Sequence, residues 1–232
     1  MMDSSLCSGP AASTRPAPGL LGVWHGVEPG AENAFDEWYD RQHHFERVGV
    51  PGFLRARRYV NLSGGPRYFN RYDVTGTDVL ASADYLERLN HPTDWTRTML
   101  PRYRDTTRAV FRLAARTGVA EGADLLTLRI RHDPAGDLDP WRSWSDDVIQ
   151  ATLNEPGVLR VERWSTDAEA STLRSEEKRL RAGGDALVAQ ALLIEGSDID
   201  RVAAAFARHL QPMVPPGSLV DRYRLVFDLR RG

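Results

Sequence analysis

The stretch Trp38-Tyr39-Asp40-Arg41-Gln42-His43-His44-Phe45-Glu46-Arg47, soon followed by Pro51-Gly52-Phe53, carries the pattern that decides the fold. Four side chains recur at helical spacing and are expected to share one helix face: Phe35, Trp38, Tyr39 and Gln42. Glu46 continues this face. A polar stripe beside it consists of Asp36, Asp40, His43 and Arg47. Because Pro-Gly ends a helix and turns the chain, we predict an amphipathic helix followed by a strand over 53–60.

Working outward from this helix, the hydrophobic pattern predicts the element order of one ferredoxin-like unit. Strands are expected over 20–27, 53–60, 67–74 and 107–114, with a second helical region over 82–90 and 93–104 that Ser82 caps. His25 shares a strand face with Leu21 and Val23, and Tyr68, Asn70 and Tyr72 share another. The first half therefore reads as strand, helix, two strands, helix and strand.

The second half repeats this order, with strands over 125–131, 158–164, 186–194 and 220–229 and helices over 140–153 and 199–210. Pro51-Gly52-Phe53-Leu54-Arg55-Ala56-Arg57-Arg58-Tyr59 aligns with Pro156-Gly157-Val158-Leu159-Arg160-Val161-Glu162-Arg163-Trp164, 105 residues later. We infer a duplication with a disordered tail at 1–18, a first repeat at 19–116, a linker at 117–124 and a second repeat at 125–232. The charged segment 168–184 is expected to be an extra helix or a mobile loop.

The two copies differ in their polar residues, and this difference points to a site. At the spacing of 105 residues, His25 falls on Ile130, His43 on Val148 and Arg47 on Thr152. A purely structural role would be required equally in both halves. The first half is therefore expected to hold a ligand site that the second half lacks.

Composition excludes several classes of function. The chain has 232 residues, is 41% hydrophobic and carries a net charge of −2, so neither a nucleic-acid nor a membrane partner is implied. Its one cysteine, Cys7, excludes an internal disulfide framework. Residues 1–18 lack the features of a signal peptide, and we expect a soluble cytoplasmic protein. Arginine outnumbers lysine so strongly, with Lys178 alone, that arginine is a poor marker of function here.

The best candidate for acid–base catalysis is His43 with Asp40 and Arg47, because a carboxylate raises the pKa of a histidine and a guanidinium lowers it. The alternative is a salt-bridged helix face without chemistry. The residues expected to bind a substrate, each of which could equally be a packing residue, are His25, Trp38, Arg58, Tyr68, Tyr72, Asn90 and Trp95. His43 and His44 cannot easily share one metal ion, because adjacent helix residues point about 100° apart. No nucleotide-binding or serine-hydrolase motif is present.

The pattern Trp38-Tyr39-Asp40-x-x-His43-x-x-Glu46-Arg47, with Pro51-Gly52-Phe53, Arg57-Arg58-Tyr59 and Asn90-x-Pro92-Thr93-x-Trp95-Thr96, resembles the dimeric α/β-barrel superfamily and, most closely, EthD-like domains. The resemblance covers about 20–114. It implies an α+β fold in which two tandem ferredoxin-like repeats build, within one chain, the barrel that single-repeat relatives build as homodimers. The chain is then a monomer or a homodimer. The family's helix histidine falls on His43, whereas His44 stands where an apolar residue is expected.

Members of that superfamily include cofactor-free monooxygenases, lactone isomerases, polyketide cyclases and haem-binding dehydratases and peroxidases. The resemblance therefore implies a cofactor-independent lyase, isomerase or cyclase acting on a small aromatic or polyketide-like molecule. His43 would move a proton, Asp40 would orient it, and Tyr72 or Arg58 would hold the oxyanion. Two alternatives stay open. One is a haem enzyme with His43, His44, His91 or His209 as the iron ligand, and the other is a non-catalytic protein that binds a small molecule.

Overall fold

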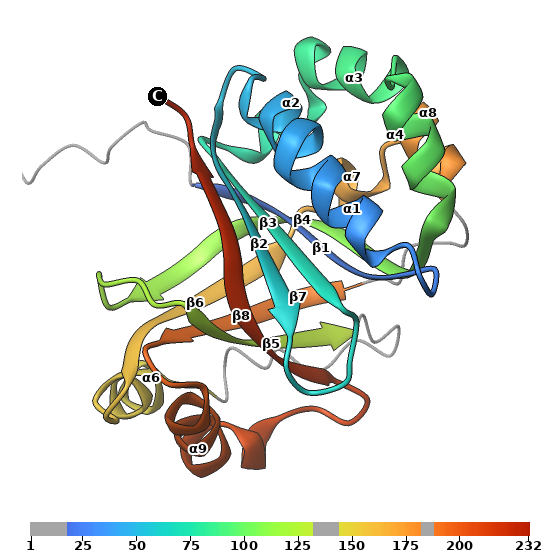
Figure 1. The fold of residues 1–232 in the computed structure, drawn as a ribbon. Helices are drawn as coiled ribbons and strands as arrows, with labels where there is room; N and C mark the ends of the chain where they lie inside the picture. Colours follow the sequence, from blue (N-terminus) through green and yellow to red (C-terminus); the bar gives the residue numbers. More distant parts are fainter. Residues whose placement is uncertain (1–17, 132–143, 182–187) are drawn as a thin grey trace, which may run out of the picture.

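The computed structural model describes residues 18–131, 144–181 and 188–232, and their strands form one closed antiparallel barrel (Figure 1). The first half contains β1 (Gly19–Val27), α1 (Glu32–Trp38), η1 (Tyr39–His43), α2 (His44–Val48), β2 (Phe53–Asn61), β3 (Tyr68–Val74), η2 (Thr77–Ala81), α3 (Ala83–Asn90), α4 (Asp94–Met99), η3 (Leu100–Arg102) and β4 (Tyr103–Thr117). The second half contains β5 (Asp124–Arg131), α6 (Asp146–Leu153), β6 (Val158–Thr166), α7 (Ala168–Thr172), α8 (Glu176–Leu180), β7 (Val188–Gly196), α9 (Ile199–His209), η4 (Gln211–Met213) and β8 (Leu219–Arg230).

The strand order around the barrel is β1-β3-β2-β8-β5-β7-β6-β4, which has a twofold pattern. Each half contributes the ferredoxin-like order, β4-β1-β3-β2 and β8-β5-β7-β6. The pairs β2–β8 and β4–β6 join the halves. The predicted α+β barrel of two ferredoxin-like halves in one chain is therefore confirmed.

Fine details recur in the two halves at equivalent positions. Gly52 and Gly157 adopt φ values of +90° and +89°, a region that only glycine enters without strain. The pairing register shifts directly after Phe53 in β2 and directly after Val158 in β6. These matches fit the inferred duplication. The predicted domain boundaries stay predictions.

The barrel interior is filled by large side chains and buried ion pairs. Arg71 Nη1 lies 2.8 Å from Glu162 and 3.2 Å from Glu195, and Arg160 Nη2 lies 2.6 Å from Glu195. Breaking such a buried pair typically costs about 3–5 kcal/mol, so this network ties the two halves together. The main apolar residues of the interior are Leu20, Trp24, Tyr59, Phe69, Phe111, Leu125, Trp164, Leu193 and Tyr223.

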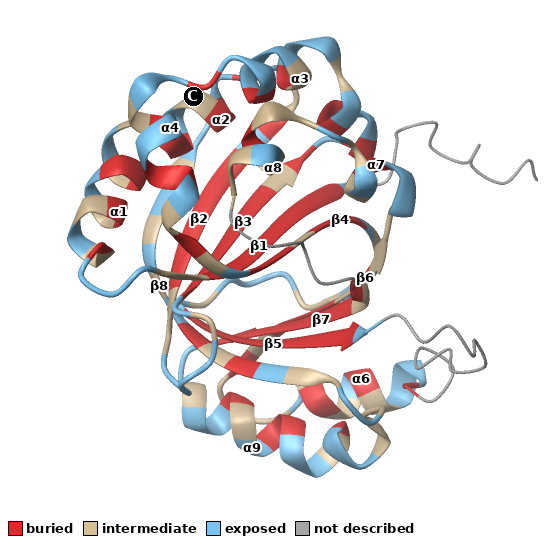
Figure 2. Cartoon of the chain, turned by 90° about the vertical axis from the view of Figure 1, so that its right-hand side faces the viewer, coloured by how far each residue is buried: buried red, intermediate tan, exposed pale blue. Residues whose placement is uncertain are grey.

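The helices cover the outer faces of the barrel. α1, α2, α3, α4, α7 and α8 lie over the first-half strands, and α6 and α9 lie on the opposite side (Figure 1). Buried residues follow the strands and the inward faces of these helices (Figure 2). No helix of the described residues combines the length and apolar character needed to cross a membrane.

A few element boundaries differ from the sequence predictions. β4 is longer than the expected strand over 107–114, and the predicted linker shortens accordingly. α6 begins only at Asp146, because the Ser145 side chain accepts a hydrogen bond from Val148 N and caps it there. The charged segment forms α7 and α8. Parts of four predictions lie outside the described residues: the tail over 1–17, the helix start at 140–143, the end of the charged segment at 182–184, and the strand start at 186–187.

Candidate functional site

The helix of the opening motif contains a π-helical turn, η1, that changes which residues face the sheet. In a regular α-helix Gln42 would follow Tyr39 on the buried face. The extra residue of the π turn instead buries His43 and His44, and Arg47 one turn later, while Gln42 stays half-buried at the rim. The predicted polar stripe was thus wrong in one respect, because two of its members lie inside the molecule. Such π turns occur frequently at functional sites.

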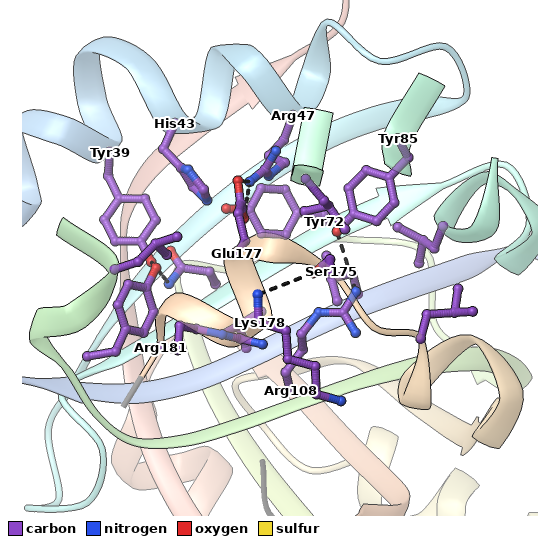
Figure 3. Close-up of a pocket in the computed structure, with 18 residues that line it drawn as sticks. Tyr39, His43, Arg47, Tyr72, Tyr85, Arg108, Ser175, Glu177, Lys178 and Arg181 are labelled. Atoms are coloured by element: carbon purple, nitrogen blue, oxygen red, sulfur yellow. Dashed lines mark hydrogen bonds and ion pairs between the residues drawn. The ribbon is translucent and has the colours of Figure 1, made fainter. Parts of the chain in front are cut away.

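A cavity of about 50 Å³ lies between this helix and the first-half strands (Figure 3). Its walls come from β1, β3, β4, the helix, α3 and η3, and it is closed by the segment 173–181 of the second half. The polar and aromatic side chains that line it are Tyr39, His43, Arg47, Asn70, Tyr72, Tyr85, Tyr103, Arg108, Ser175, Glu177, Lys178 and Arg181. The apolar lining consists of Leu21, Val23, Leu80, Leu89, Leu100 and Leu173.

A buried hydrogen-bond network stands at one end of the cavity. His25 Nδ1 lies 2.9 Å from the carbonyl oxygen of Gly26, so this nitrogen carries the proton and donates it. His25 Nε2 then accepts from the Tyr39 hydroxyl at 2.9 Å. The Tyr39 oxygen accepts in turn from Asn70 Nδ2 at 3.1 Å and from the Tyr103 hydroxyl.

The environment fixes the protonation states in this network. Burial lowers the pKa of His25 to about 3 and raises the pKa values of Tyr39, Tyr72 and Tyr103. The imidazole is therefore neutral and the phenols stay protonated at neutral pH. The Tyr39 and Tyr103 protons are used within the network, which leaves the Tyr72 hydroxyl to donate a hydrogen bond to a ligand oxygen.

His43 is the ionisable group best placed for proton transfer. It lines the cavity with only 6% of its surface exposed, and its Nδ1 has no hydrogen-bond partner among the described residues. The Trp38 ring lies against it, with the centroids 4.2 Å apart. Burial first, and the Arg47 charge second, hold the pKa of His43 well below its ordinary value. The ring is consequently neutral and able to accept a proton.

Arg47 forms a buried ion pair with Glu177, which reaches the cavity from α8 (Figure 3). Both carboxylate oxygens of Glu177 bind the same nitrogen, Nη2. Nη1 is buried and has no partner among the described residues. Arg47 was predicted to act with His43 on one helix face, and the structure adds an acidic partner 130 residues away in sequence.

His44 does not face the cavity. Its ring lies between the rings of Tyr39 and Phe227, with centroid distances of 4.8 and 4.9 Å. Neither ring nitrogen has a hydrogen-bond partner among the described residues. His44 thus occupies the packed position where an apolar residue was expected.

Several predicted site residues lie elsewhere. Asp40 does not pair with His43; its carboxylate lies 2.9 Å from Arg58 Nη2. Arg58 Nη1 donates to the carbonyl oxygen of Asp36, just as Arg163 donates to that of Trp144 in the second half. Because the contact recurs in the second half, it accounts for Arg58 without a ligand, and the substrate-binding role of Arg58 stays a prediction.

Trp38, Tyr68, Asn90 and Trp95 also stand outside the cavity wall. Trp38 packs on His43, and the Tyr68 hydroxyl accepts from Arg67 Nε at 3.0 Å. Asn90 Oδ1 accepts from the backbone N–H of Glu176 and so holds the start of α8, while Trp95 packs against the core. Of the predicted residues, the structure brings together His43, Arg47 and Tyr72 at the cavity, with His25 behind Tyr39.

Sequence reasoning missed Tyr39, Tyr85, Tyr103 and Arg108, together with three residues of the second half, Glu177, Lys178 and Arg181. Two signals were present in the sequence. Tyr39 belongs to the opening motif, and Lys178 is the one lysine in the chain. No pattern in the sequence indicated that the charged segment lies over the first half.

The equivalent space in the second half is apolar. Helix α6 and its strands meet through Leu126, Leu128, Ile130, Ile149, Val161, Leu192 and Ile194. Ile130, at the position that corresponds to His25, is part of this core. The difference between the halves that the sequence indicated is therefore present where the helix packs on the sheet.

A metal or haem site finds little support in this geometry. No group of three His, Cys, Asp or Glu side chains within the described ranges could hold a metal ion. A haem needs an imidazole over a wide apolar pocket. His43 supplies the imidazole, but about 50 Å³ is far below the roughly 300–1,000 Å³ of cofactor and ligand pockets, and charged groups line the space. In this closed arrangement the cavity is too small for a haem, and the haem alternative stays a prediction.

Comparisons with known proteins place the fold. No family model and no curated protein matches the sequence. Among solved structures, an anthrone oxidase-like protein superposes with a TM-score of 0.61 at 11% identity over 96% of each chain. A candidate monooxygenase from Fusobacterium nucleatum subsp. nucleatum gives 0.57 at 12% identity, over 94% of this chain and 96% of that one.

A chlorite dismutase variant from Candidatus Nitrospira defluvii gives a TM-score of 0.51 at 11% identity, over 90% of this chain and 92% of that chain. Identities this low show a shared fold only. Each of these chains is matched over nearly its whole length, so the likeness includes both halves of the barrel. The protein therefore has the dimeric α/β-barrel fold, with both ferredoxin-like halves in one chain.

Proposed function

We propose that the first-half cavity is the active site of a small-molecule enzyme that moves a proton on a planar aromatic substrate without a dedicated cofactor. The observation that carries this proposal is His43, a buried neutral imidazole that lines the cavity and whose Nδ1 has no partner among the described residues. The reaction class is that of a lyase, isomerase, cyclase or cofactor-free oxygenase. The finer resemblance to EthD-like domains belongs to the same proposal.

His43 acts as the general base. Its neutral ring takes a proton from a carbon or oxygen next to a conjugated carbonyl of the substrate. The resulting imidazolium and enolate stabilise each other, because opposite charges attract strongly in a site that excludes water. Burial and Arg47 hold the ring neutral before the reaction, which is the state that a base requires.

The developing oxyanion is held by the Tyr72 phenol. Tyr72 lines the cavity, and burial raises its pKa, so its hydroxyl donates a hydrogen bond rather than ionises. Asn70 and His25 keep the Tyr39 hydroxyl in place. Of the two residues that the sequence suggested for this role, Tyr72 and Arg58, we propose Tyr72, and Asp40 has no part in the reaction.

A ring-sized substrate needs more room than the closed cavity offers. A volume of about 50 Å³ holds a few water molecules. Since residues 173–181 form one wall and reach it from the second half, their displacement is the step that admits a ligand. Apolar walls and stacked rings suit a planar aromatic body.

Anthrone is a suitable first probe. Its methylene group is conjugated with the carbonyl, so loss of one proton gives an extended enolate, and one structural neighbour is an anthrone oxidase-like protein. In air the same enolate can react with one O₂, which supplies the new carbonyl oxygen of anthraquinone and leaves one water. Proton abstraction comes first in either outcome.

The test measures deuterium uptake at that methylene in D₂O without oxygen, by mass spectrometry. Wild-type protein should accelerate the exchange, and His43→Asn should slow it by about 100-fold or more, since general bases contribute roughly 10²–10⁴. His209→Asn, which alters a histidine bound to Glu155 on the far side, is the matched control and should have no effect. Exchange that is equal in wild type and His43→Asn would reject the role of His43.

Two other outcomes would assign the cavity differently. Tight binding of aromatic molecules without exchange would make the protein a binding protein rather than an enzyme. The haem alternative stays a prediction that an absorbance spectrum of the purified protein tests. A Soret band would support it and contradict the cofactor-free reaction.

A further inference from the structure

The Arg47–Glu177 pair uses only one of the two terminal nitrogens of the Arg47 guanidinium group. A carboxylate usually binds arginine through two parallel N–H···O bonds from two nitrogens. Here both oxygens of Glu177 bind Nη2, one of them at 2.6 Å, and Nη1 stays buried without a partner among the described residues. Arg47 has only 2% of its surface exposed, so water does not compensate the free donor.

Basic side chains outnumber acidic ones among the residues that line the cavity. Four cationic side chains line it: Arg47, Arg108, Lys178 and Arg181. Glu177 is the one carboxylate among the described residues of its wall. Figure 3 shows Arg47 and Glu177 meeting at the top of the cavity, with Lys178, Arg181 and Arg108 below them. Among these groups, Arg47 has a buried nitrogen without a partner in the described residues, so it is the cation that an anionic ligand fits.

We propose that the natural ligand is an aromatic carboxylate whose carboxylate group replaces Glu177 on Arg47. This inference deepens the proposed function and rests on it. The aromatic body lies along Tyr72 and Tyr85, and the ligand carboxylate accepts hydrogen bonds from Nη1 and Nη2 together. Glu177 occupies the anion position while the cavity is empty.

Replacement of Glu177 also explains how a cavity of about 50 Å³ admits a ring. Glu177 belongs to α8, and its bond to Arg47 fastens that helix over the first half. An anionic ligand replaces Glu177 as the partner of Arg47. Helix α8 can then move away without leaving Arg47 unpaired. A neutral ligand of the same shape releases the helix less readily and binds more weakly, because a buried guanidinium without an acceptor is costly.

The experiment compares two ligands of the same shape, 2-naphthoate and 2-naphthamide, by isothermal titration calorimetry with the full chain. Wild type should bind the carboxylate at least about tenfold more tightly than the amide, in line with charge-assisted hydrogen bonds. Glu177→Gln should bind 2-naphthoate about tenfold more tightly than wild type, because it removes the competing carboxylate.

The double variant Arg47→Gln/Glu177→Gln removes both charges of the pair, so no buried charge is left alone and folding is preserved. It should bind the two ligands with equal affinity. The double variant Arg208→Gln/Glu155→Gln removes another ion pair, one outside the cavity, and is the matched control because neither double variant changes the net charge. Its preference for the carboxylate should equal that of wild type.

Equal affinity for both ligands in wild type, or an unchanged preference in the double variant, would overturn the anion site. The same holds if neither ligand binds any of the proteins. Anthrone is neutral, and its exchange at His43 is measured separately, so the proposed proton transfer can survive the loss of this inference. Conversely, an intact preference for the carboxylate without His43-dependent exchange would support the anion site and reject the proton transfer.

Discussion

At the scale of single residues, the first half is distinguished by buried histidines that stay neutral. His25, His43 and His44 are buried, and burial is the main cause that lowers each pKa. Their roles differ, because His25 holds Tyr39, His43 faces the cavity, and His44 packs between two rings. Similar burial is thus found in a hydrogen-bond network, at the proposed catalytic base and at a packed core position.

His44 offers a prediction about stability. Both of its nitrogens are buried without partners among the described residues, which typically costs about 1–3 kcal/mol. His44→Leu keeps a similar volume and removes these polar atoms, so we expect a gain of about 1–2 kcal/mol in the free energy of unfolding. Urea denaturation at neutral pH measures it. A loss of stability would mean that the nitrogens of His44 make contacts that matter.

The same histidines predict a pH dependence. The folded pKa of His25, about 3, lies below the unfolded value of 6.5, so the unfolded chain binds more protons within that window. Stability should therefore be fully present above about pH 6.5 and fall as the pH drops, by up to ~1.4 kcal/mol per pH unit for each such histidine.

Urea denaturation between pH 7 and pH 5 tests this expectation, because the carboxylates with shifted pKa values titrate below that range. His44→Leu should show a shallower slope, with one fewer proton taken up on unfolding. A stability that does not change between pH 7 and pH 5 would show that these histidines are not buried and neutral.

At the scale of elements, the π turn explains where prediction from sequence succeeded and failed. Helical spacing identified Phe35, Trp38 and Tyr39 as buried, and they are. The same spacing placed Gln42 inside and His43 on the shoulder, and this was wrong from Tyr39 onward. A single inserted residue rotates the following part of the helix by about 100°. The π turn is stabilised by packing against the sheet, and the local sequence does not specify this packing.

Deletion of one residue tests the π turn. Arg41 has an exposed side chain. Its removal shortens the spacing between the buried residues Tyr39 and His44 from five positions to four, which is α-helical spacing. We expect this variant to fold and melt cooperatively, while the exchange activity falls because His43 shifts relative to Tyr72. Thermal melts followed by circular dichroism measure the first effect.

Deletion of Glu37 is the matched control, because this residue is exposed on the same helix and lies in its regular α part. Its removal separates Phe35 from Trp38 by two positions and rotates one of them out of the core. We expect that variant to lose its cooperative melt. Equal damage from the two deletions would argue against the π turn.

At the scale of the whole molecule, the two halves share a scaffold and differ in one interface. The repeated motif predicted the barrel and the half that holds the cavity, because both follow from patterns within each half. It did not predict Glu177, Lys178 or Arg181 at the site, since these residues reach it across the join between the halves. Contacts between residues 130 positions apart depend on the packed barrel, which no local pattern encodes.

The shared scaffold predicts matched effects at Arg58 and Arg163. Each donates from its strand to a carbonyl oxygen near the preceding helix and pairs with a carboxylate there. Arg58→Gln and Arg163→Gln should both lower the free energy of unfolding, by about 1–3 kcal/mol, with the larger loss at the more buried Arg58. Urea denaturation measures this, and anthrone exchange should stay within a few-fold of wild type. A selective loss of exchange in Arg58→Gln would return this residue to the active site.

The most direct test of the proposed site is the position of a bound aromatic molecule in a crystal of the full chain soaked with anthraquinone, a stable and neutral analogue of the oxidised probe. We predict that the rings lie in the first-half cavity between His43 and Tyr103, with α8 moved away from Arg47. Rings bound against α6 or α9 in the second half, with the Arg47–Glu177 pair still closed, would contradict this prediction.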